Sequence, residues 1–113
     1  MEVRFSRKRI AKLCSTSRAM VREWGADCAK RLQQRLSELE AAETLDDMRA
    51  LPGARCHELK GNRKGQLAVD LTHPYRLVFE PDDEPRPERS DGGLDWRQVT
   101  RIVVMEVVDY HRE

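Results

Sequence analysis

The chain has 113 residues, of which 39% are hydrophobic and 36% charged, and its formal net charge is +1. A chain of this length buries only about two-thirds of its unfolded surface, so it predicts one domain with a modest core and excludes a second catalytic domain. No apolar run approaches the roughly 18 residues that span a bilayer, and the basic opening lacks the apolar stretch of a signal peptide. We therefore expect a cytoplasmic protein with no membrane partner.

Charge is segregated along the chain. Residues 1–22 carry seven Lys or Arg against one acid, and residues 52–79 carry five against two. Residues 80–97 reverse the balance, with seven acids against three bases. Two basic zones separated by acidic ones predict a localised anionic partner, with ordinary solvated charge as the alternative.

The first half of the chain is predicted to be mainly helical. Alternation of polar and apolar residues over 2–5 indicates a half-buried strand, and Ser6 then offers an N-cap for a short basic helix that ends near residues 15–17. From Arg18 onward, apolar residues recur at steps of three and four, which indicates one long amphipathic helix. Its apolar face is predicted to hold Val21, Trp24, Cys28, Leu32, Leu36 and Leu39. Its solvated face is predicted to hold Arg22, Asp27, Arg31, Gln34, Arg35 and Glu38.

The second half is predicted to be mainly sheet. Thr44, followed by two acids, resembles the N-cap of a short helix that ends before Leu51, and the Pro-Gly pair after it marks the change from helix to strand. Strands are predicted at residues 55–59, 66–71, 75–80 and 99–108. The segment 81–97, with three prolines and two glycines, is predicted to be a flexible charged hairpin or loop instead of a packed element. The pattern predicts a single α+β domain over 1–113, with the N-terminal strand and the helices packed on one face of a largely antiparallel sheet.

This sheet would gather cations, imidazoles and a phenol at one end. The candidates lie at strand ends, in the turn that follows the strand at 55–59 and, for one arginine, inside a strand: His57, Lys60, Arg63, Lys64, Arg76, Tyr110 and His111. Arg76 sits within an apolar strand and should project from the open face of the sheet, because burying an unpaired guanidinium is costly. Each candidate also has a purely structural interpretation: turn lysines are usually solvated, His57 could cover the sheet, and Tyr110 could be a terminal aromatic.

The residue types exclude several chemistries. No cluster of carboxylates or Cys/His ligands has metal-site spacing, so no metal is expected. Cys14, Cys28 and Cys56 form no CxxC pair and are expected to be reduced structural residues. The glycines around residues 61–65 match neither a phosphate loop nor a dinucleotide fingerprint. Such a set can instead bind a phosphodiester and help a neighbouring 2′-hydroxyl attack it, because that reaction needs a base, a proton donor and cations.

The stretches PGARCHELKGNRKGQLAVDL, PYRLVF and VVMEVVDYH, in this order, resemble the HigB branch of the RelE/ParE toxin superfamily, whose members are often labelled plasmid-maintenance killer proteins. The order of elements also agrees from Met1 to His111. The resemblance implies a RelE-like fold and the toxin of a type II toxin–antitoxin pair, which cleaves mRNA on the 70S ribosome without a cofactor through a 2′,3′-cyclic phosphate. It also implies a HigA-like helix-turn-helix antitoxin as partner, with operator DNA contacted only through that antitoxin.

The resemblance also implies roles for the candidate residues. Lys60 and Arg76 would neutralise the scissile phosphate and the developing charge, and His57 and Tyr110 would transfer protons. The residues that would contact mRNA or ribosomal RNA are Arg63, Lys64, His73 and His111. A phenol has an unperturbed pKa near 10 and an imidazole near 6.5, so a Tyr base would require strong cationic help whereas His57 would not. Which residue is the base and which the acid stays open.

Two departures from the family pattern stand out. Relatives often carry a basic residue just before the strand that contains Arg76, where this chain has residues 70–74 and His73 is the candidate substitute. The 81–97 segment is longer than usual, and its surplus of acids makes it a poor candidate for contact with RNA phosphates. The alternatives are a ParE-like toxin that poisons DNA gyrase on the same fold, and a degenerate chain that keeps only antitoxin binding and co-repression.

Overall fold

The structure, a computed structural model, describes residues 1–112 and has an α+β fold. Its strands are β1 (Glu2–Phe5), β2 (His57–Glu58), β3 (Leu67–Asp70), β4 (Tyr75–Pro81) and β5 (Arg101–Asp109). Its helices are α1 (Lys8–Leu13), α2 (Ser17–Trp24) and α3 (Ala26–Ala41). Short 3-10 turns occupy Leu45–Ala50, Pro52–Ala54, Gly61–Arg63, Trp96–Gln98 and Tyr110–Arg112. No helix among these residues is both long and apolar enough to cross a bilayer.

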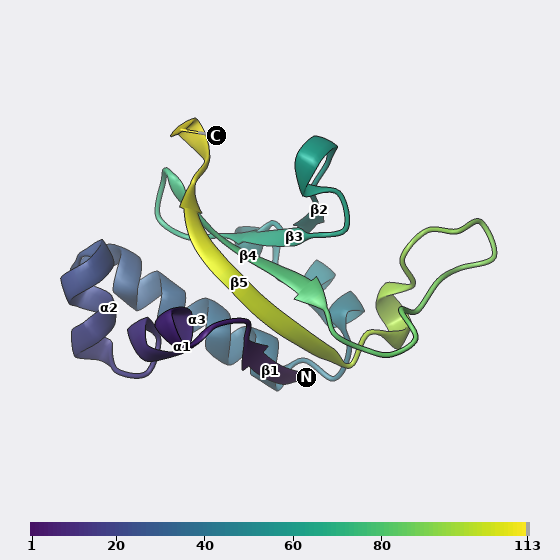
Figure 1. The fold of residues 1–113 in the computed structure, drawn as a ribbon, viewed down its shortest axis with the longest axis horizontal. Coiled ribbons are helices and arrows are strands. Elements are labelled where there is room, and N and C mark those ends of the chain that lie inside the picture. The colour runs from purple at the N-terminus through teal and green to yellow at the C-terminus, as the bar shows by residue number, and fades with distance from the viewer. Residues whose placement is uncertain (113) are drawn as a thin grey trace.

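The five strands form one mixed sheet in the order β1-β5-β4-β3-β2. The β1 strand lies at one edge and pairs in parallel with β5, whereas the other three pairings are antiparallel. The three α-helices lie on one side of this sheet, and the turn after β2 and the C-terminus rise on the other side (Figure 1). The predicted layer arrangement is confirmed.

Alternation along β4 separates the two faces of the sheet, because successive side chains of a strand point to opposite sides. Leu77 and Phe79 are fully buried in the large core between sheet and helices. Val78 belongs to a much smaller apolar cluster on the other face, with Leu59, Ala68 and Val108. The face opposite the helices is therefore only thinly covered, and polar side chains can gather on it.

The predicted long helix is in fact two helices. Gly25 has a φ of +87°, a conformation that ends α2 and that glycine adopts without steric cost. The apolar spacing of the sequence continues across this break, but the buried face does not follow it: Met20 is buried in the core, and Val21 is 41% exposed. The cap of α1 also differs, since Arg7 and not Ser6 takes the N-cap position. The predicted cap at Thr44 is confirmed, and Asp47 completes a capping box there.

Arg35 was predicted to be solvated, and that was wrong, because only 2% of it is exposed. It lies three residues after Leu32 and four before Leu39, so helical spacing places it on the buried face of α3. Its Nε donates to the carbonyl of Asp70 at 2.7 Å and its Nη2 to the carbonyl of Gly53 at 2.7 Å. Its Nη1 donates to the Glu38 carboxylate at 2.9 Å. The buried charge is thus satisfied and ties α3 to the sheet.

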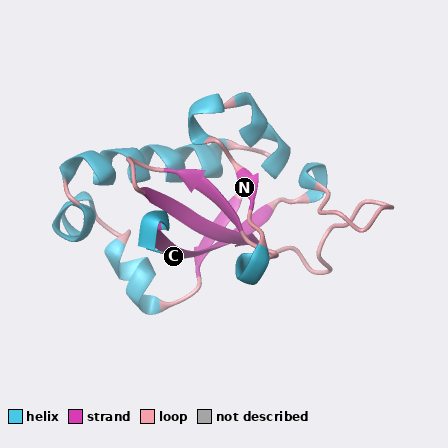
Figure 2. Ribbon diagram, turned by 90° about the horizontal axis from the view of Figure 1, so that it is seen from above, coloured by secondary structure: helices cyan, strands magenta, loops and turns pink. Residues whose placement is uncertain are grey.

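Two other predicted segments need correction. The strand expected at 55–59 shortens to His57–Glu58, because Arg55 has a left-handed φ of +45° and cannot continue a strand. The segment 81–97 was predicted to be unpacked, yet Leu94 and Trp96 are buried in the main core. Only the part between these anchors and β4 projects from the sheet as a long loop, which both Figure 1 and Figure 2 show.

Candidate active site

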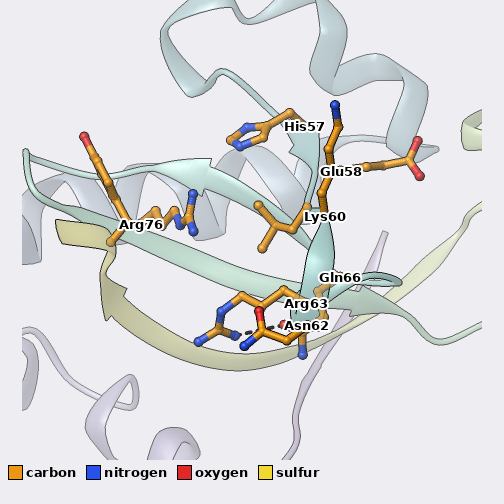
Figure 3. A pocket seen from close by; sticks show the side chains of 9 residues that line it. His57, Glu58, Lys60, Asn62, Arg63, Gln66 and Arg76 are labelled. Atoms are coloured by element: carbon orange, nitrogen blue, oxygen red, sulfur yellow. Dashed lines mark hydrogen bonds between the residues drawn. The ribbon is translucent and has the colours of Figure 1, made fainter. Parts of the chain in front are cut away.

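A cleft of about 780 Å³ opens on the face of the sheet opposite the helices. It lies between the start of β4, the turn after β2 and the C-terminal end of β5. The cleft is lined by His57, Glu58, Leu59, Lys60, Asn62, Arg63, Gln66, Arg76 and Tyr110. In Figure 3, His57 and Arg76 project from different elements toward the same open space, and the Glu58 side chain extends away from it. All four residues predicted to be catalytic line this one cleft.

Arg76 lies on β4 next to the buried Leu77 and faces the cleft, as the strand alternation predicted. The side chain is half-buried and its Nε is inaccessible to solvent, so Arg76 is less exposed than its predicted position implied. The carbon at the centre of its guanidinium lies 5.2 Å from the centroid of the Tyr110 ring. A cation held in this way is preorganised for an anionic group that enters the cleft.

His57 is oriented by the backbone. Its Nδ1 lies 2.7 Å from the carbonyl oxygen of Arg55. A carbonyl oxygen only accepts hydrogen bonds, so Nδ1 carries the proton and Nε2 has the free lone pair when the ring is neutral. The left-handed conformation of Arg55 turns its carbonyl back toward the ring two residues later. His57 therefore has the tautomer of a general base.

Tyr110 is held by a histidine from another part of the chain. Its hydroxyl lies 2.8 Å from Nδ1 of His73, and Nε2 of His73 lies 2.8 Å from Nε2 of His111. One nitrogen of the two-histidine contact must carry a proton for this bond to form. The three rings pack with centroids 4.6 to 5.6 Å apart. The arrangement forms a continuous chain of hydrogen bonds from His111 to the phenol in the cleft.

The turn after β2 supplies the remaining cations. Lys60 is exposed at its start. Arg63 is half-buried and donates from Nη1 to the Gln66 side chain at 2.9 Å and to the Glu106 carboxylate at 3.3 Å, which braces the turn against β5. Lys64 does not line this cleft but a neighbouring one. The predicted RNA-contacting residues therefore do not share one position. Arg63 lines the cleft and Lys64 lies beside it. His73 is hydrogen-bonded to Tyr110, and His111 to His73, and neither lines the cleft.

The only carboxylate among the described lining residues is that of Glu58. It accepts a hydrogen bond from the indole nitrogen of Trp96 at 3.1 Å. Within residues 1–112, no group of three His, Cys, Asp or Glu side chains is arranged to hold a metal ion. The lining leaves cations, an imidazole and a phenol facing the open space.

The three cysteines are free thiols outside this cleft. Burial raises the pKa of Cys14 to about 11 and that of Cys56 to about 12. Burial also raises the pKa of Cys28. A thiol is nucleophilic as the thiolate, so these residues are poorly suited to nucleophilic catalysis at neutral pH.

Sequence reasoning missed the direct link between His73 and Tyr110, because the link follows from the register of the strands. β4 and β5 are antiparallel and Tyr75 pairs with Asp109, so the residues just outside that pair must meet. The amide of Tyr110 accordingly donates to the carbonyl of Pro74 at 3.2 Å. The bond between Trp96 and Glu58 had no comparable signal, because it depends on the path of the long loop.

Comparison with known proteins gives three matches. A family model described as the RelE-like toxin of the type II toxin–antitoxin system HigB matches residues 9–86. Toxin HigB-1 of Vibrio cholerae serotype O1 is 39% identical over 49 residues, which are 43% of this chain and 52% of that protein, so the alignment spans about half of the relative. The solved structure of a YoeB/ParE toxin from Agrobacterium tumefaciens has a TM-score of 0.52 and 11% identity, with 95% of each chain covered. At that identity the match shows a shared fold.

Proposed function

Since the chain belongs to the HigB-like family of RelE-like toxins from type II toxin–antitoxin systems, we propose that it is a metal-independent endoribonuclease that cuts mRNA on the ribosome and stops translation. The observation that carries this proposal is the gathering of His57, Arg76 and Tyr110 around one cleft on the open face of the sheet. A cation, a base and a proton donor are what 2′-hydroxyl attack on a phosphodiester requires.

In the proposed reaction, Nε2 of His57 takes the proton of the 2′-hydroxyl. The 2′-oxygen then forms a bond to phosphorus, and the bond between phosphorus and the 5′-oxygen breaks. The products are a 2′,3′-cyclic phosphate and a 5′-hydroxyl. The fixed tautomer of His57 supports this role, because its Nδ1 proton is held by the Arg55 carbonyl and Nε2 is left to accept.

Tyr110 is the proposed proton donor to the leaving 5′-oxygen. His73 Nδ1 returns a proton to the phenolic oxygen, and His111 Nε2 supplies His73 Nε2 in turn. A His111 that starts as the imidazolium ends neutral, so the protons balance. In this proposal His73 is a positioning residue that acts through Tyr110, and it does not contact the RNA itself.

Arg76 and Lys60 provide the positive charge in the proposed mechanism. The half-buried guanidinium of Arg76 suits the charge that develops on the phosphorane oxygens, since it is partly shielded from water and already in position. Lys60 is exposed, and a lysine carries its charge at the end of a flexible stem, which suits the neutralisation of the phosphate as it enters. Removal of a preorganised donor of this kind typically costs about 100- to 1,000-fold in rate.

The proposed partners follow from the same function. The RNA substrate is mRNA in the 70S ribosome, and the neutralising partner is a HigA-like helix-turn-helix antitoxin, through which the toxin would reach operator DNA. The basic segment of residues 1–22 offers further positive surface for ribosomal RNA.

Induction of the protein in growing bacteria tests this function against gyrase poisoning. We expect incorporation of labelled amino acids to fall before incorporation of labelled thymidine, and expect Tyr110→Phe, at equal abundance, to leave both unchanged over the same period. Continued protein synthesis accompanied by early DNA-damage signalling would instead indicate a ParE-like action and contradict the proposal.

A further inference from the structure

A second cleft, of about 570 Å³, lies between the turn after β2 and the long loop at residues 86–94. Glu58, Leu59 and Lys60 line both this cleft and the first one, so the two clefts lie next to each other along this segment. A polymer with one unit in the first cleft therefore has the second cleft beside it.

The charged side chains that line the second cleft are mainly cationic. Lys60, Lys64 and Arg86 are all exposed and reach it from two sides, Arg86 from the loop and the lysines from the turn. The terminal nitrogen Nη2 of Arg86 lies 3.5 Å from the carbonyl of Gly65, which places the guanidinium against the turn. Among the described lining residues the one carboxylate is that of Glu58, which accepts a hydrogen bond from the indole nitrogen of Trp96.

Three acids of the segment that follows β4, none of which lines the second cleft, are hydrogen-bonded to other groups. Asp82 forms a salt bridge with Arg4 at 2.6 Å. Asp83 accepts from the backbone amide of Thr100 at 3.1 Å and from its hydroxyl at 2.7 Å. Asp91 accepts from the amide of Gly93 at 2.8 Å. These bonds keep the pKa of Asp82 and that of Asp91 below the usual range of a carboxyl group. Glu84 and Glu88 do not line the second cleft either, so the acidic composition of the loop does not make the lining of this cleft acidic.

We propose that the second cleft binds the backbone of the same RNA strand, at nucleotides next to the scissile phosphate, through Lys64 and Arg86. The inference rests on the proposed function for the identity of the polymer, and it extends the site to a loop that is not part of the catalytic cleft. It reverses the expectation from composition that the long loop is a poor candidate for contact with phosphates. The loop then contributes a wall of the RNA path instead of serving as a dispensable connection.

A binding experiment that needs no catalysis tests this inference. The probe is a short single-stranded RNA with a 2′-O-methyl group on every nucleotide, which cannot be cleaved because the attacking hydroxyl is blocked. Its Kd is measured by fluorescence anisotropy over a range of salt concentrations. Arg86→Ala and Lys64→Ala should each weaken binding by about 5- to 10-fold at low salt and should each reduce the slope of log Kd against log salt by about 0.7.

Arg97→Ala is the matched control. Arg97 lies in the same charged segment, is exposed and carries the same charge, but it lines a different cleft. Its removal should leave the Kd within about twofold of the unaltered protein, since a surface charge away from the path contributes little. The inference is overturned if Arg86→Ala binds the probe as well as Arg97→Ala does, or if the unaltered protein does not bind the probe at low salt.

Failure of this inference is distinguishable from failure of the proposed function. If the unaltered protein cuts mRNA on ribosomes while Arg86→Ala and Lys64→Ala leave the Kd unchanged, the second cleft is not an RNA site and the nuclease proposal stands. If both variants lose affinity and the unaltered protein does not cut mRNA, the cleft binds RNA and the nuclease proposal is wrong.

Discussion

The hydroxyl of Tyr110 lies 2.8 Å from Nδ1 of His73, although the two residues are separated by 37 positions in sequence. The antiparallel pairing of β4 with β5 brings them together, because each lies just beyond the paired residues Tyr75 and Asp109. A phenol that is both hydrogen-bonded and directed into a cationic cleft is suited to proton transfer.

Tyr110→Phe should slow cleavage of ribosome-bound mRNA by about 100-fold or more, because it removes only the hydroxyl that is proposed to donate the proton. The ring and its contact with Arg76 remain, so the thermal unfolding temperature should change little. Single-turnover cleavage and thermal unfolding of the same preparations provide the measurement. An unchanged cleavage rate would exclude Tyr110 from proton transfer.

His73→Asn should separate hydrogen bonding from proton relay. The Asn amide can hydrogen-bond to the Tyr110 hydroxyl from a position near that of Nδ1, but it cannot pass a proton on. We expect the cleavage rate to fall by about 10-fold or more with a changed pH–rate profile, whereas KM stays the same because His73 does not contact RNA in this account. A rise in KM with an unchanged kcat and pH profile would instead assign His73 to RNA binding, as the sequence first suggested.

Arg35→Met should destabilise the fold, although it changes no residue that lines the cleft. It leaves the carbonyls of Gly53 and Asp70 and the carboxylate of Glu38 without their buried donor, and the loss of one partner of a buried pair costs about 3–5 kcal/mol. Chemical denaturation measures the free energy of unfolding. Arg31→Ala on the exposed side of the same helix is the control and should change it by about 0.5 kcal/mol or less. Equal effects of the two variants would show that Arg35 does not tie α3 to the sheet.

Cys56 should react slowly with iodoacetamide in the folded protein. Its pKa is about 12 because of burial, so at pH 8.5 its alkylation should be about 100-fold slower or more than in denaturant. Folding raises the pKa of this thiol above its value near 9 in the unfolded protein. Its contribution to stability is therefore fully present below about pH 9 and is lost as the pH rises toward the pKa of the folded state. The free energy of unfolding should accordingly fall above pH 9, and less so in Cys56→Ala. Alkylation at equal rates in the folded and denatured protein would contradict the burial of this thiol.

Much of the fold follows from local patterns in the sequence. Strand alternation located β4 and the cleft-facing side of Arg76, and the capping residues located the turn at Thr44. The break at Gly25 was missed because apolar spacing continues across it, and a single glycine inside a helical pattern is often tolerated. The burial of Arg35 was missed because a charged side chain was assigned to the solvated face, although its helical spacing places it on the buried one.

The candidate site was only partly predictable for a related reason. Residues within one turn or one strand, such as His57 and Lys60, could be grouped from the sequence alone. Contacts across the fold required the strand register, as for His73, or the path of the long loop, as for Arg86. Composition alone does not show which acids of that loop are already paired: Asp82 forms a salt bridge with Arg4, and Asp91 accepts a hydrogen bond from the amide of Gly93.

The most direct test of the nuclease account is the rate at which Arg76→Ala cleaves mRNA on ribosomes, measured beside the unaltered protein and with thermal unfolding on the same samples. Arg76 is half-buried, so its truncation should cost about 1–2 kcal/mol of stability while the protein stays folded. We expect cleavage to fall by about 100- to 1,000-fold, with 2′,3′-cyclic phosphate ends on the products of the unaltered protein. A folded Arg76→Ala protein that cuts mRNA at nearly the unaltered rate would contradict this account.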